Sequence, residues 1–284
     1  MSLIADPTES LADEDLASWT SLQAAIEAVG ASVVALSGGA DSALLAWAAH
    51  RVLGADRALA ATAVSASLPT DELDECRRLA AEWGLSWRGV ETTEIDDPRY
   101  VANDADRCYW CKTALLDALE PLAAERGATV VLGVNADDLS DHRPGQRAAA
   151  ERGARFPLLE AGLSKARVRS LSRSLGLRTA DKPAAACLAS RVPYGTAVTI
   201  GVLSEVEAAE GALRALGFEQ LRVRHHRDVG RIEVPVDRLA EVVDRRDEVV
   251  AAVVAAGFRY VALDLEGFRS GSMNRALGGP IATE

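Results

Sequence analysis

The chain has little positive charge, few aromatic residues and no long hydrophobic run. Its 284 residues include 31 Lys or Arg against 42 Asp or Glu, so the formal net charge is -11. Because contacts to phosphate supply most of the affinity for nucleic acid, this acidic balance argues against a nucleic-acid partner and favours a small-molecule substrate. No stretch approaches the ~18 uninterrupted apolar residues of a membrane-spanning helix, so we expect no membrane partner.

Cysteine is also scarce, with four residues at positions 76, 108, 111 and 187. The first residues are polar and acidic and lack the basic and apolar segments of a signal peptide, so we expect a cytoplasmic protein. Thiols stay reduced in that compartment, which excludes a disulfide framework and leaves buried fillers, metal ligands or catalytic thiols. We assign Cys76, which lies inside a predicted helix, to the core.

Apolar sequence is abundant, at 49% of the residues, and it is arranged as alternating strands and helices. Strands are predicted at 32–36, 58–64, 86–91 and 129–132. Helices are predicted at 13–29, 42–52, 69–83 and 107–126. This alternation predicts an α/β fold with a parallel sheet that helices cover on both faces. In such a sheet, ligands bind beyond the carboxyl ends of the strands.

The pattern changes after about Gly195, which indicates a second, smaller domain. We expect a helix at 202–216, strands at 220–225, 229–234 and 258–263, and helical stretches over 237–255. Only a short turn separates the first two strands, so they predict a hairpin in a small α+β domain. We therefore divide the chain into domains at 1–195 and 196–284.

The segment SGGADS at 37–42 lies directly between the first predicted strand and a helix. Its two glycines allow the backbone to approach an oligophosphate and to point N–H groups at it, and the helix N-terminus attracts the same anion. The serine hydroxyls add donors, and a magnesium ion that bridges Asp41 to the phosphates explains the carboxylate. We expect Ser37, Gly38, Gly39 and Ser42 to bind the phosphates directly, and Asp41 to bind them through the magnesium ion.

This hexapeptide resembles the signature of the PP-loop ATP pyrophosphatases, and it is not a Walker motif because the Gly-Lys-Ser/Thr ending is absent. That superfamily includes NAD and GMP synthetases, argininosuccinate synthetases and tRNA thiolases, and its fold is adenine nucleotide alpha hydrolase-like. The resemblance implies that ATP is cleaved between its α- and β-phosphates and that the acceptor becomes adenylated. Pyrophosphate then stays in the loop.

Three of the cysteines lie in two settings that can support chemistry. Cys108 and Cys111 form a CxxC at the start of a predicted helix, and Cys187 precedes Arg191 in PAAACLASRVPYG. A cysteine near a helix N-terminus or a cation has a lowered pKa and is a better nucleophile. Four interpretations are open: core residues, a zinc site that lacks a second CxxC, a three-cysteine iron–sulfur cluster with one open iron, and Cys187 alone as nucleophile or sulfur donor.

Five stretches together resemble the LarE family of ATP-dependent sulfur transferases. They are RCYWCK at 107–112, GVNADDLSDHRPG at 133–145, CLASRVPYG at 187–195, LRVRHH at 221–226 and YVALDLEGFRSGSMN at 260–274. The resemblance runs from about Ser32 to Asn274, nearly the whole chain. The combination is much more specific than any one of the motifs.

The resemblance implies a role in making the nickel-pincer nucleotide of lactate racemase from a pyridinium-3,5-biscarboxylic acid mononucleotide. ATP adenylates a carboxylate of this substrate, and a cysteine thiolate displaces AMP to form a thioester. Cleavage of the cysteine carbon–sulfur bond then leaves a thiocarboxylate on the product and dehydroalanine on the enzyme. Cys187 matches the sulfur-donating cysteine of the family.

Cys108 and Cys111 depart from family members that have a single donor cysteine and match members with three, which are thought to hold a 4Fe–4S cluster. We therefore hypothesise that Cys108, Cys111 and Cys187 bind such a cluster, whose open iron carries an extra sulfide to the acyl-adenylate. The cofactors implied are ATP, Mg²⁺ and this 4Fe–4S cluster.

Charged residues outside these motifs are further candidates. Arg222 and Arg224 alternate along one predicted strand, so they share a face that can bind the mononucleotide phosphate. Glu210 and Glu233 are candidate metal or substrate ligands. Candidate contacts to the adenylate, magnesium or phosphate in the first domain are Asn135, Asp137, Asp138, Arg143, Lys165 and Lys182.

Three other functions are compatible with a PP-loop. A tRNA thiolase would use the same ATP chemistry on a base, and the acidic balance argues against it. An amidating synthetase that uses ammonia would leave the three cysteines without a role. A non-catalytic nucleotide-binding module would bind ATP without releasing pyrophosphate. We expect the protein to be a homo-oligomer.

Overall fold

A computed structural model describes residue 8 and residues 11–140, 144–183 and 186–269 of the chain. The chain forms two compact units. The first takes its residues from Met1–Thr93 and Cys108–Ala185, and the second from Glu94–Arg107 and Ala186–Glu284. Residues 94–107 therefore join the second unit before the first is complete.

The first unit is built on a four-stranded sheet in which all strands run parallel. Its spatial order is β3-β2-β1-β4, with β1 (Ser32–Ala35), β2 (Ala58–Val64), β3 (Ser86–Glu91) and β4 (Thr129–Val131). Its helices are α1 (Asp13–Val29), α2 (Ala40–Leu53), α3 (Thr70–Trp83), α5 (Arg107–Glu125), η3 (Ala136–Ser140), α6 (Pro144–Glu151), α7 (Pro157–Glu160) and α8 (Lys165–Ser174). The predicted α/β fold with a parallel sheet is confirmed.

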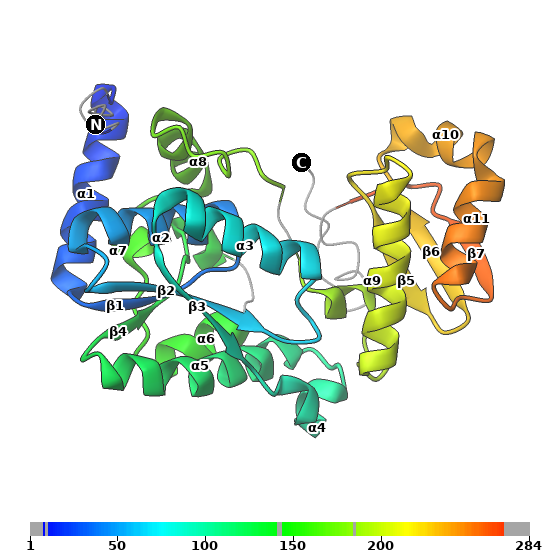
Figure 1. The fold of residues 1–284 in the computed structure, drawn as a ribbon, viewed down its shortest axis with the longest axis horizontal. Coiled ribbons are helices and arrows are strands. Elements are labelled where there is room, and N and C mark those ends of the chain that lie inside the picture. The colour runs from blue at the N-terminus through cyan, green and yellow to red at the C-terminus, as the bar shows by residue number, and fades with distance from the viewer. Residues whose placement is uncertain (1–7, 9–10, 141–143, 184–185, 270–284) are drawn as a thin grey trace. The chain divides into compact units, whose positions relative to one another are not determined.

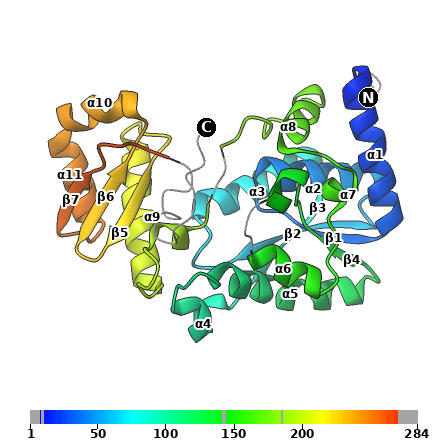
Figure 2. The ribbon, with the colours of Figure 1, turned by 180° about the vertical axis from the view of Figure 1, so that it is seen from behind.

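Apolar residues cover both faces of this sheet, because neighbouring residues of a strand point to opposite sides. Val34 of β1 packs in a core with α1, α2 and α8, whereas Val33 packs on the other side with α5 and α6. Figure 1 and Figure 2 show the two helical layers, with α2, α3 and α8 on one side of the sheet and α5 and α6 on the other. Strands buried on both faces are nearly continuous apolar runs, which is why the run at 58–64 predicted a strand.

The second unit holds a three-stranded sheet of β5 (Arg222–His226), β6 (Val229–Glu233) and β7 (Tyr260–Leu263). β5 and β6 form the predicted antiparallel hairpin, and β7 pairs with β6 in parallel. Its helices are η2 (Glu94–Asp96), α4 (Pro98–Val101), η4 (Leu188–Arg191), α9 (Ile200–Ala215), η5 (Val236–Arg238), α10 (Leu239–Asp244) and α11 (Arg246–Ala255). A Cβ at Gly230 would lie 2.9 Å from the Val253 side chain, so α11 packs closely on β6 where no side chain intervenes.

The predicted boundary at residue 195 lies inside the second unit, because the segment before it is bonded to that unit. Arg191 donates two hydrogen bonds of 2.9 Å to Glu210 of α9. The Gly195 N–H donates to the carbonyl of Asn103 at 3.0 Å. These contacts join residues that are far apart in the sequence, so no local sequence pattern predicts them.

Candidate functional site

The loop after β1 adopts the strand–loop–helix arrangement that its sequence predicts. Gly38 has a φ of 76°, a left-handed conformation that favours glycine, and Gly39 is the residue before α2 begins. The Ser42 hydroxyl accepts the Ser37 N–H at 3.1 Å and lies 3.0 Å from the Ser37 hydroxyl. It also donates to the Gly39 carbonyl at 3.1 Å. The two serines therefore tie the ends of the loop together at the N-terminus of α2.

A second loop reaches this one from β4, and Gly133 makes the approach possible. A Cβ at position 133 would lie 2.8 Å from the backbone nitrogen of Ser42, closer than side chains come. In the sheet, β1 lies between β2 and β4. The chain continues from β1 to β2 and β3 on one side, and it returns to the other side of β1 as β4. This is the switch point where open α/β sheets bind ligands. Our sequence analysis did not single out Gly133, although a glycine directly after a strand is a signal for a close backbone approach.

Three of the predicted site residues meet between these two loops. The Asn135 amide donates to Asp41 Oδ1 at 3.2 Å, and the Asn135 N–H donates to Asp138 Oδ2 at 3.1 Å. Asn135 is 2% exposed, so it is a fixed bridge between the loops. Asp137 lies beside them, where its carboxylate accepts the N–H of Lys165 at 2.8 Å. Arg143, the other candidate of this region, lies outside the described residues.

The electrostatics of this group favour a bound cation. Burial raises the pKa of Asp41, and the nearby Asp138 raises it further, against the hydrogen bond from Asn135 and the charges of Lys165 and Arg169. Ionised Asp41 is therefore less stable here than in water. Two carboxylates and an amide oxygen are donors that magnesium accepts when phosphate oxygens complete its shell. The donor set thus suits the magnesium ion predicted for this loop.

The cysteines of the first unit differ in their surroundings. Cys108 is exposed and Cys111 is half-buried, three residues apart on the first turns of α5. Side chains with this spacing lie on one face of a helix. Cys76 of α3 is fully buried, with its Sγ 3.8 Å from the Leu36 carbonyl, and burial raises its thiol pKa. Cys76 is therefore a core residue, as predicted.

Cys187 lies in the second unit, directly before η4, and its main chain is held by three donors. Its carbonyl accepts the Ser190 N–H at 3.0 Å, the Ser190 hydroxyl at 2.7 Å and Arg191 Nη1 at 3.0 Å. Arg191 also donates to the carbonyl of Ala186 at 2.6 Å. The Cys187 side chain is half-buried, so a fixed backbone carries a thiol that solvent can reach.

Both candidate glutamates of the second unit pair with arginines. Glu210 is fully buried and accepts both Nε and Nη2 of Arg191, whereas Glu233 accepts Arg224 Nε at 3.0 Å and Nη2 at 2.7 Å. These pairs explain the buried carboxylates without a metal ion. Arg224 also donates to the Ser190 carbonyl at 3.0 Å, so it supports the Cys187 segment rather than an exposed anion site.

Arg222 differs from Arg224, although the two share one strand. Its guanidinium lies over the Phe268 ring at 5.2 Å. Burial, together with the neighbouring positive charges of Arg191, Arg224 and Arg214, lowers its pKa to about 10. An anion beside Arg222 would offset these charges, so this residue keeps the predicted role in phosphate binding as a hypothesis.

Sequence analysis missed a second clamp on the Cys187 segment. Asn103 is fully buried with a left-handed φ of 54°, and its amide donates to the carbonyls of Pro193 and Thr196 at 2.8 Å. Arg107 donates to Asn103 Oδ1 at 2.5 Å and to the Ala189 carbonyl at 2.9 Å. The residue before Cys108 is therefore bonded to the segment that carries Cys187. Asn is one of the few residues that tolerate a positive φ, which is the only sequence signal for this site.

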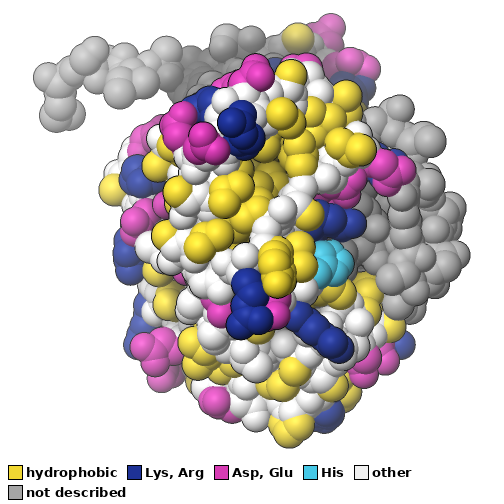
Figure 3. All heavy atoms as spheres, turned by 90° about the vertical axis from the view of Figure 1, so that its right-hand side faces the viewer, with side chains coloured by type: hydrophobic (Ala, Val, Ile, Leu, Met, Phe, Trp, Pro, Cys, Tyr) yellow, Lys and Arg dark blue, Asp and Glu magenta, His cyan; other side chains and the backbone are white. Residues whose placement is uncertain are grey.

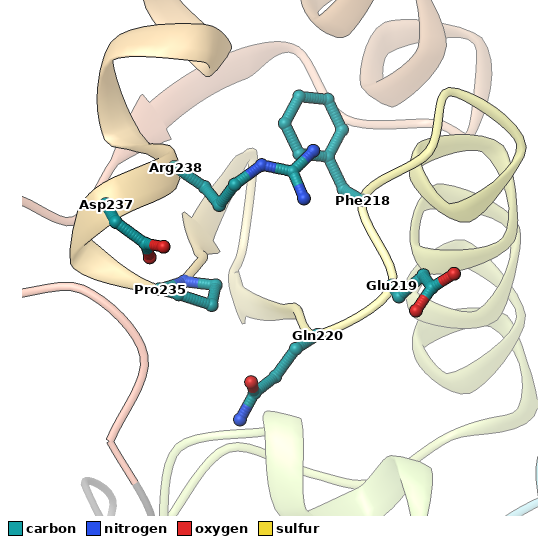
Figure 4. A pocket seen from close by; sticks show the side chains of 6 residues that line it. All are labelled: Phe218, Glu219, Gln220, Pro235, Asp237 and Arg238. Carbon is teal, nitrogen blue, oxygen red and sulfur yellow. The ribbon is translucent and has the colours of Figure 1, made fainter.

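Other features of the described residues do not single out a site. The described residues contain no group of three His, Cys, Asp or Glu side chains that could hold a metal ion. No helix within them combines the length and hydropathy needed to cross a bilayer. Figure 4 shows a pocket of about 410 Å³ in the second unit, whose walls include none of the predicted site residues. Its lining is Phe218, Glu219, Gln220, Pro235, Asp237 and Arg238.

No family model matches the chain. It is 47% identical over 249 residues to an uncharacterised protein of Synechocystis sp., and the alignment covers 87% of this chain and 92% of that protein. It is 40% identical over 257 residues to the pyridinium-3,5-bisthiocarboxylic acid mononucleotide synthase of Lactiplantibacillus plantarum, and the alignment covers 90% of this chain and 93% of the synthase. An uncharacterised protein of Methanocaldococcus jannaschii is 27% identical over 192 residues. The likeness to the synthase covers so much of the chain that it extends over both units.

Proposed function

The chain belongs to the LarE family of sulfur transferases, and from this premise we propose its reaction. ATP adenylates a carboxylate of a pyridinium-3,5-biscarboxylic acid mononucleotide, and sulfur then replaces the adenylate to give a thiocarboxylate for a nickel-pincer cofactor. The observation that carries this proposal is the 40% identity, over 90% of the chain, to a synthase named for the bisthiocarboxylic acid product.

The adenylation step has a matching site in the first unit. A carboxylate oxygen of the substrate attacks the α-phosphorus of ATP, and pyrophosphate leaves. The glycine loop at the N-terminus of α2 offers backbone N–H groups to the leaving pyrophosphate. Asp41 and Asp138 would hold a magnesium ion, which supplies positive charge for the phosphates. Asn135 fixes both carboxylates, so the loops keep their spacing when the nucleotide binds.

The sulfur step is assigned to Cys187. Its thiolate can attack the acyl carbon and displace AMP to form a thioester. A base then removes the Cα proton of Cys187 while the Cβ–S bond breaks, which leaves dehydroalanine in the chain and a thiocarboxylate on the product. Alternatively, Cys108, Cys111 and Cys187 hold a 4Fe–4S cluster, for which they supply three thiolates. The helical spacing of Cys108 and Cys111 supports their joint use as ligands, because side chains three residues apart lie on one face of a helix.

One anaerobic experiment separates these sulfur sources and tests the proposal itself. The protein is purified without oxygen, assayed for iron and sulfide, and weighed intact after reaction with ATP, magnesium and the biscarboxylate nucleotide. About four irons and an unchanged mass support the cluster route. A colourless protein that is lighter by one hydrogen sulfide at Cys187 supports the sacrificial route. Absence of pyrophosphate release with this substrate would refute the proposed function.

The expected homo-oligomer is also part of the proposal. On α10, α11 and β7 of the second unit, four large apolar side chains are between 43% and 60% exposed, namely Val243, Val250, Val254 and Tyr260. Figure 3 shows hydrophobic side chains gathered on this face of the unit. Contiguous exposed apolar surface commonly marks an interface. Light scattering on the purified protein measures the mass, and a monomer at micromolar concentration would refute the proposed association.

A further inference from the structure

An ion pair lies directly against the phosphate loop. A Cβ at Gly38 would be 3.3 Å from the Glu72 carboxylate and 3.5 Å from the Lys182 ammonium. Lys182 Nζ donates to Glu72 Oε2 at 2.6 Å, and both side chains are 20% exposed. The Lys182 ammonium is therefore at ordinary contact distance from position 38, and the Glu72 carboxylate is slightly closer. The loop that is expected to receive phosphates thus has a lysine beside it, and an internal carboxylate holds that lysine.

The backbone of Lys182 is fixed independently of Glu72. Arg169 of α8 donates to the carbonyls of Ala180 and Lys182 at 3.2 and 3.0 Å. Arg169 also lies near enough to Asp41 to lower its pKa, as does Lys165. Basic residues of α8 and of the segment after it therefore lie near the loop, and the main chain of Lys182 is held by bonds that do not involve its ammonium.

Glu72 pairs with a lysine, whereas Asp74 and Glu75 of the same helix pair with arginines. Glu75 pairs with Arg178 and Arg78, and Asp74 pairs with Arg77, all through guanidinium groups. A guanidinium binds a carboxylate in a fixed planar geometry, whereas an ammonium is a compact charge on a flexible stem that can change partners. Lys182, the cation that Glu72 binds, lies 3.5 Å from where a Cβ would stand at Gly38 of the loop.

We propose that Lys182 binds the phosphates of ATP and that Glu72 competes with them for this lysine. Incoming phosphate oxygens take the ammonium from Glu72, which then lies beside the bound anion and weakens its binding. When pyrophosphate leaves, Glu72 recovers the lysine, so the pair favours product release. The inference rests on the proposed adenylation chemistry, and it adds a competing group that tunes affinity for both ATP and pyrophosphate.

The test compares Glu72→Gln with Glu75→Gln, a matched control on the same helix whose carboxylate pairs with arginines away from Gly38. Magnesium pyrophosphate and magnesium ATP are titrated calorimetrically into each full-length protein, and pyrophosphate inhibition is measured in the turnover assay. Glu72→Gln should tighten pyrophosphate binding about three- to tenfold, because a competing charge is lost. Glu75→Gln should change it less than about twofold, since its charge is farther away and screened.

Lys182 variants complete the design. Lys182→Gln should weaken pyrophosphate binding about tenfold or more, and Lys182→Arg should recover part of the loss. If Glu72→Gln instead weakens binding, or matches Glu75→Gln, the pair is a structural link and the inference is wrong. If the wild-type protein binds neither ATP nor pyrophosphate, the proposed function itself fails. Melting temperatures of all four variants identify any that lose affinity by unfolding, and Lys182→Arg then decides the role of the lysine.

Discussion

We predict that Glu210→Ala will destabilise the second unit strongly. The Glu210 carboxylate is fully buried and accepts two hydrogen bonds from Arg191, one from Arg214 at 3.0 Å and one from the Val223 N–H at 3.0 Å. Arg191 is 2% exposed. Removing the carboxylate would therefore leave a guanidinium charge buried without its counter-ion.

The size of the effect follows from this burial. Breaking a buried ion pair by removing one partner typically costs about 3–5 kcal/mol. Arg191 would keep its bonds to the carbonyls of Ala186 and Cys187, and Arg214 is partly exposed and can turn toward water. We therefore expect the lower part of that range, about 3–4 kcal/mol. This loss is a large fraction of the roughly 5–15 kcal/mol that stabilises a typical domain.

The positions of the tryptophans provide the assay. All five, at 19, 47, 83, 87 and 110, belong to the first unit. Tryptophan fluorescence during urea unfolding therefore reports on the first unit, whereas circular dichroism reports on both. For Glu210→Ala we expect an additional early transition in circular dichroism and an unchanged fluorescence midpoint.

Glu241→Ala is the matched control for this prediction. Glu241 pairs with Arg238 through two hydrogen bonds in the same unit, but the pair is exposed to solvent, so its loss should matter far less. Equal effects of the two substitutions would refute the reasoning from burial. Fluorescence and circular dichroism midpoints that fall together would refute the assignment of the loss to the second unit.

Three further predictions concern the sites. Gly133→Ala should abolish ATP binding in a calorimetric titration, because its Cβ would lie 2.8 Å from the Ser42 nitrogen. Asp41→Asn should raise the melting temperature at neutral pH. The pKa of Asp41 is raised in the folded protein, so its ionisation weakens the fold as the pH rises through that pKa. The gain in melting temperature should therefore vanish below about pH 4, where the carboxyl is protonated in both states. Arg222→Gln should weaken mononucleotide binding and leave the ATP dissociation constant unchanged, because its guanidinium lies in the second unit.

The secondary structure that sequence predicted well is the part with strong local patterns. The strands at 58–64 and 86–91 and the helix at 13–29 have the same bounds in the structure, and each is followed by a glycine or a polar residue, namely Ser65, Thr92 and Gly30. Three helices between 144 and 174 were not predicted. They are short, and helices of four to ten residues depend on tertiary contacts such as the burial of Leu158 and Val168 rather than on propensity.

The same distinction applies to the site residues. The phosphate loop could be predicted because strand, glycines and helix are contiguous. The sequence predicted Glu210 and Glu233 as candidate metal or substrate ligands, but the arginine partners of Glu233 depend on the register of β5 and β6. In that register Arg222 faces Glu233 across the hairpin, while the guanidinium groups that bind Glu233 belong to Arg224 on the diagonal and to Arg231 on the same strand. Charge alternation alone could not distinguish these two arginines.

The arginines near Cys187 differ in what they contact, which suggests two different roles. Arg191 and Arg224 are each neutralised by a buried glutamate, and their remaining N–H groups hold carbonyls around Cys187. Arg222 has a pKa lowered to about 10 by burial and by these neighbouring cations, so its charge is the one that an incoming anion would relieve. A reactive cysteine needs a fixed main chain, and a phosphorylated substrate needs a cation that gains from its charge. We therefore expect Arg191 and Arg224 to hold the main chain around Cys187, and Arg222 to meet the phosphate of the substrate.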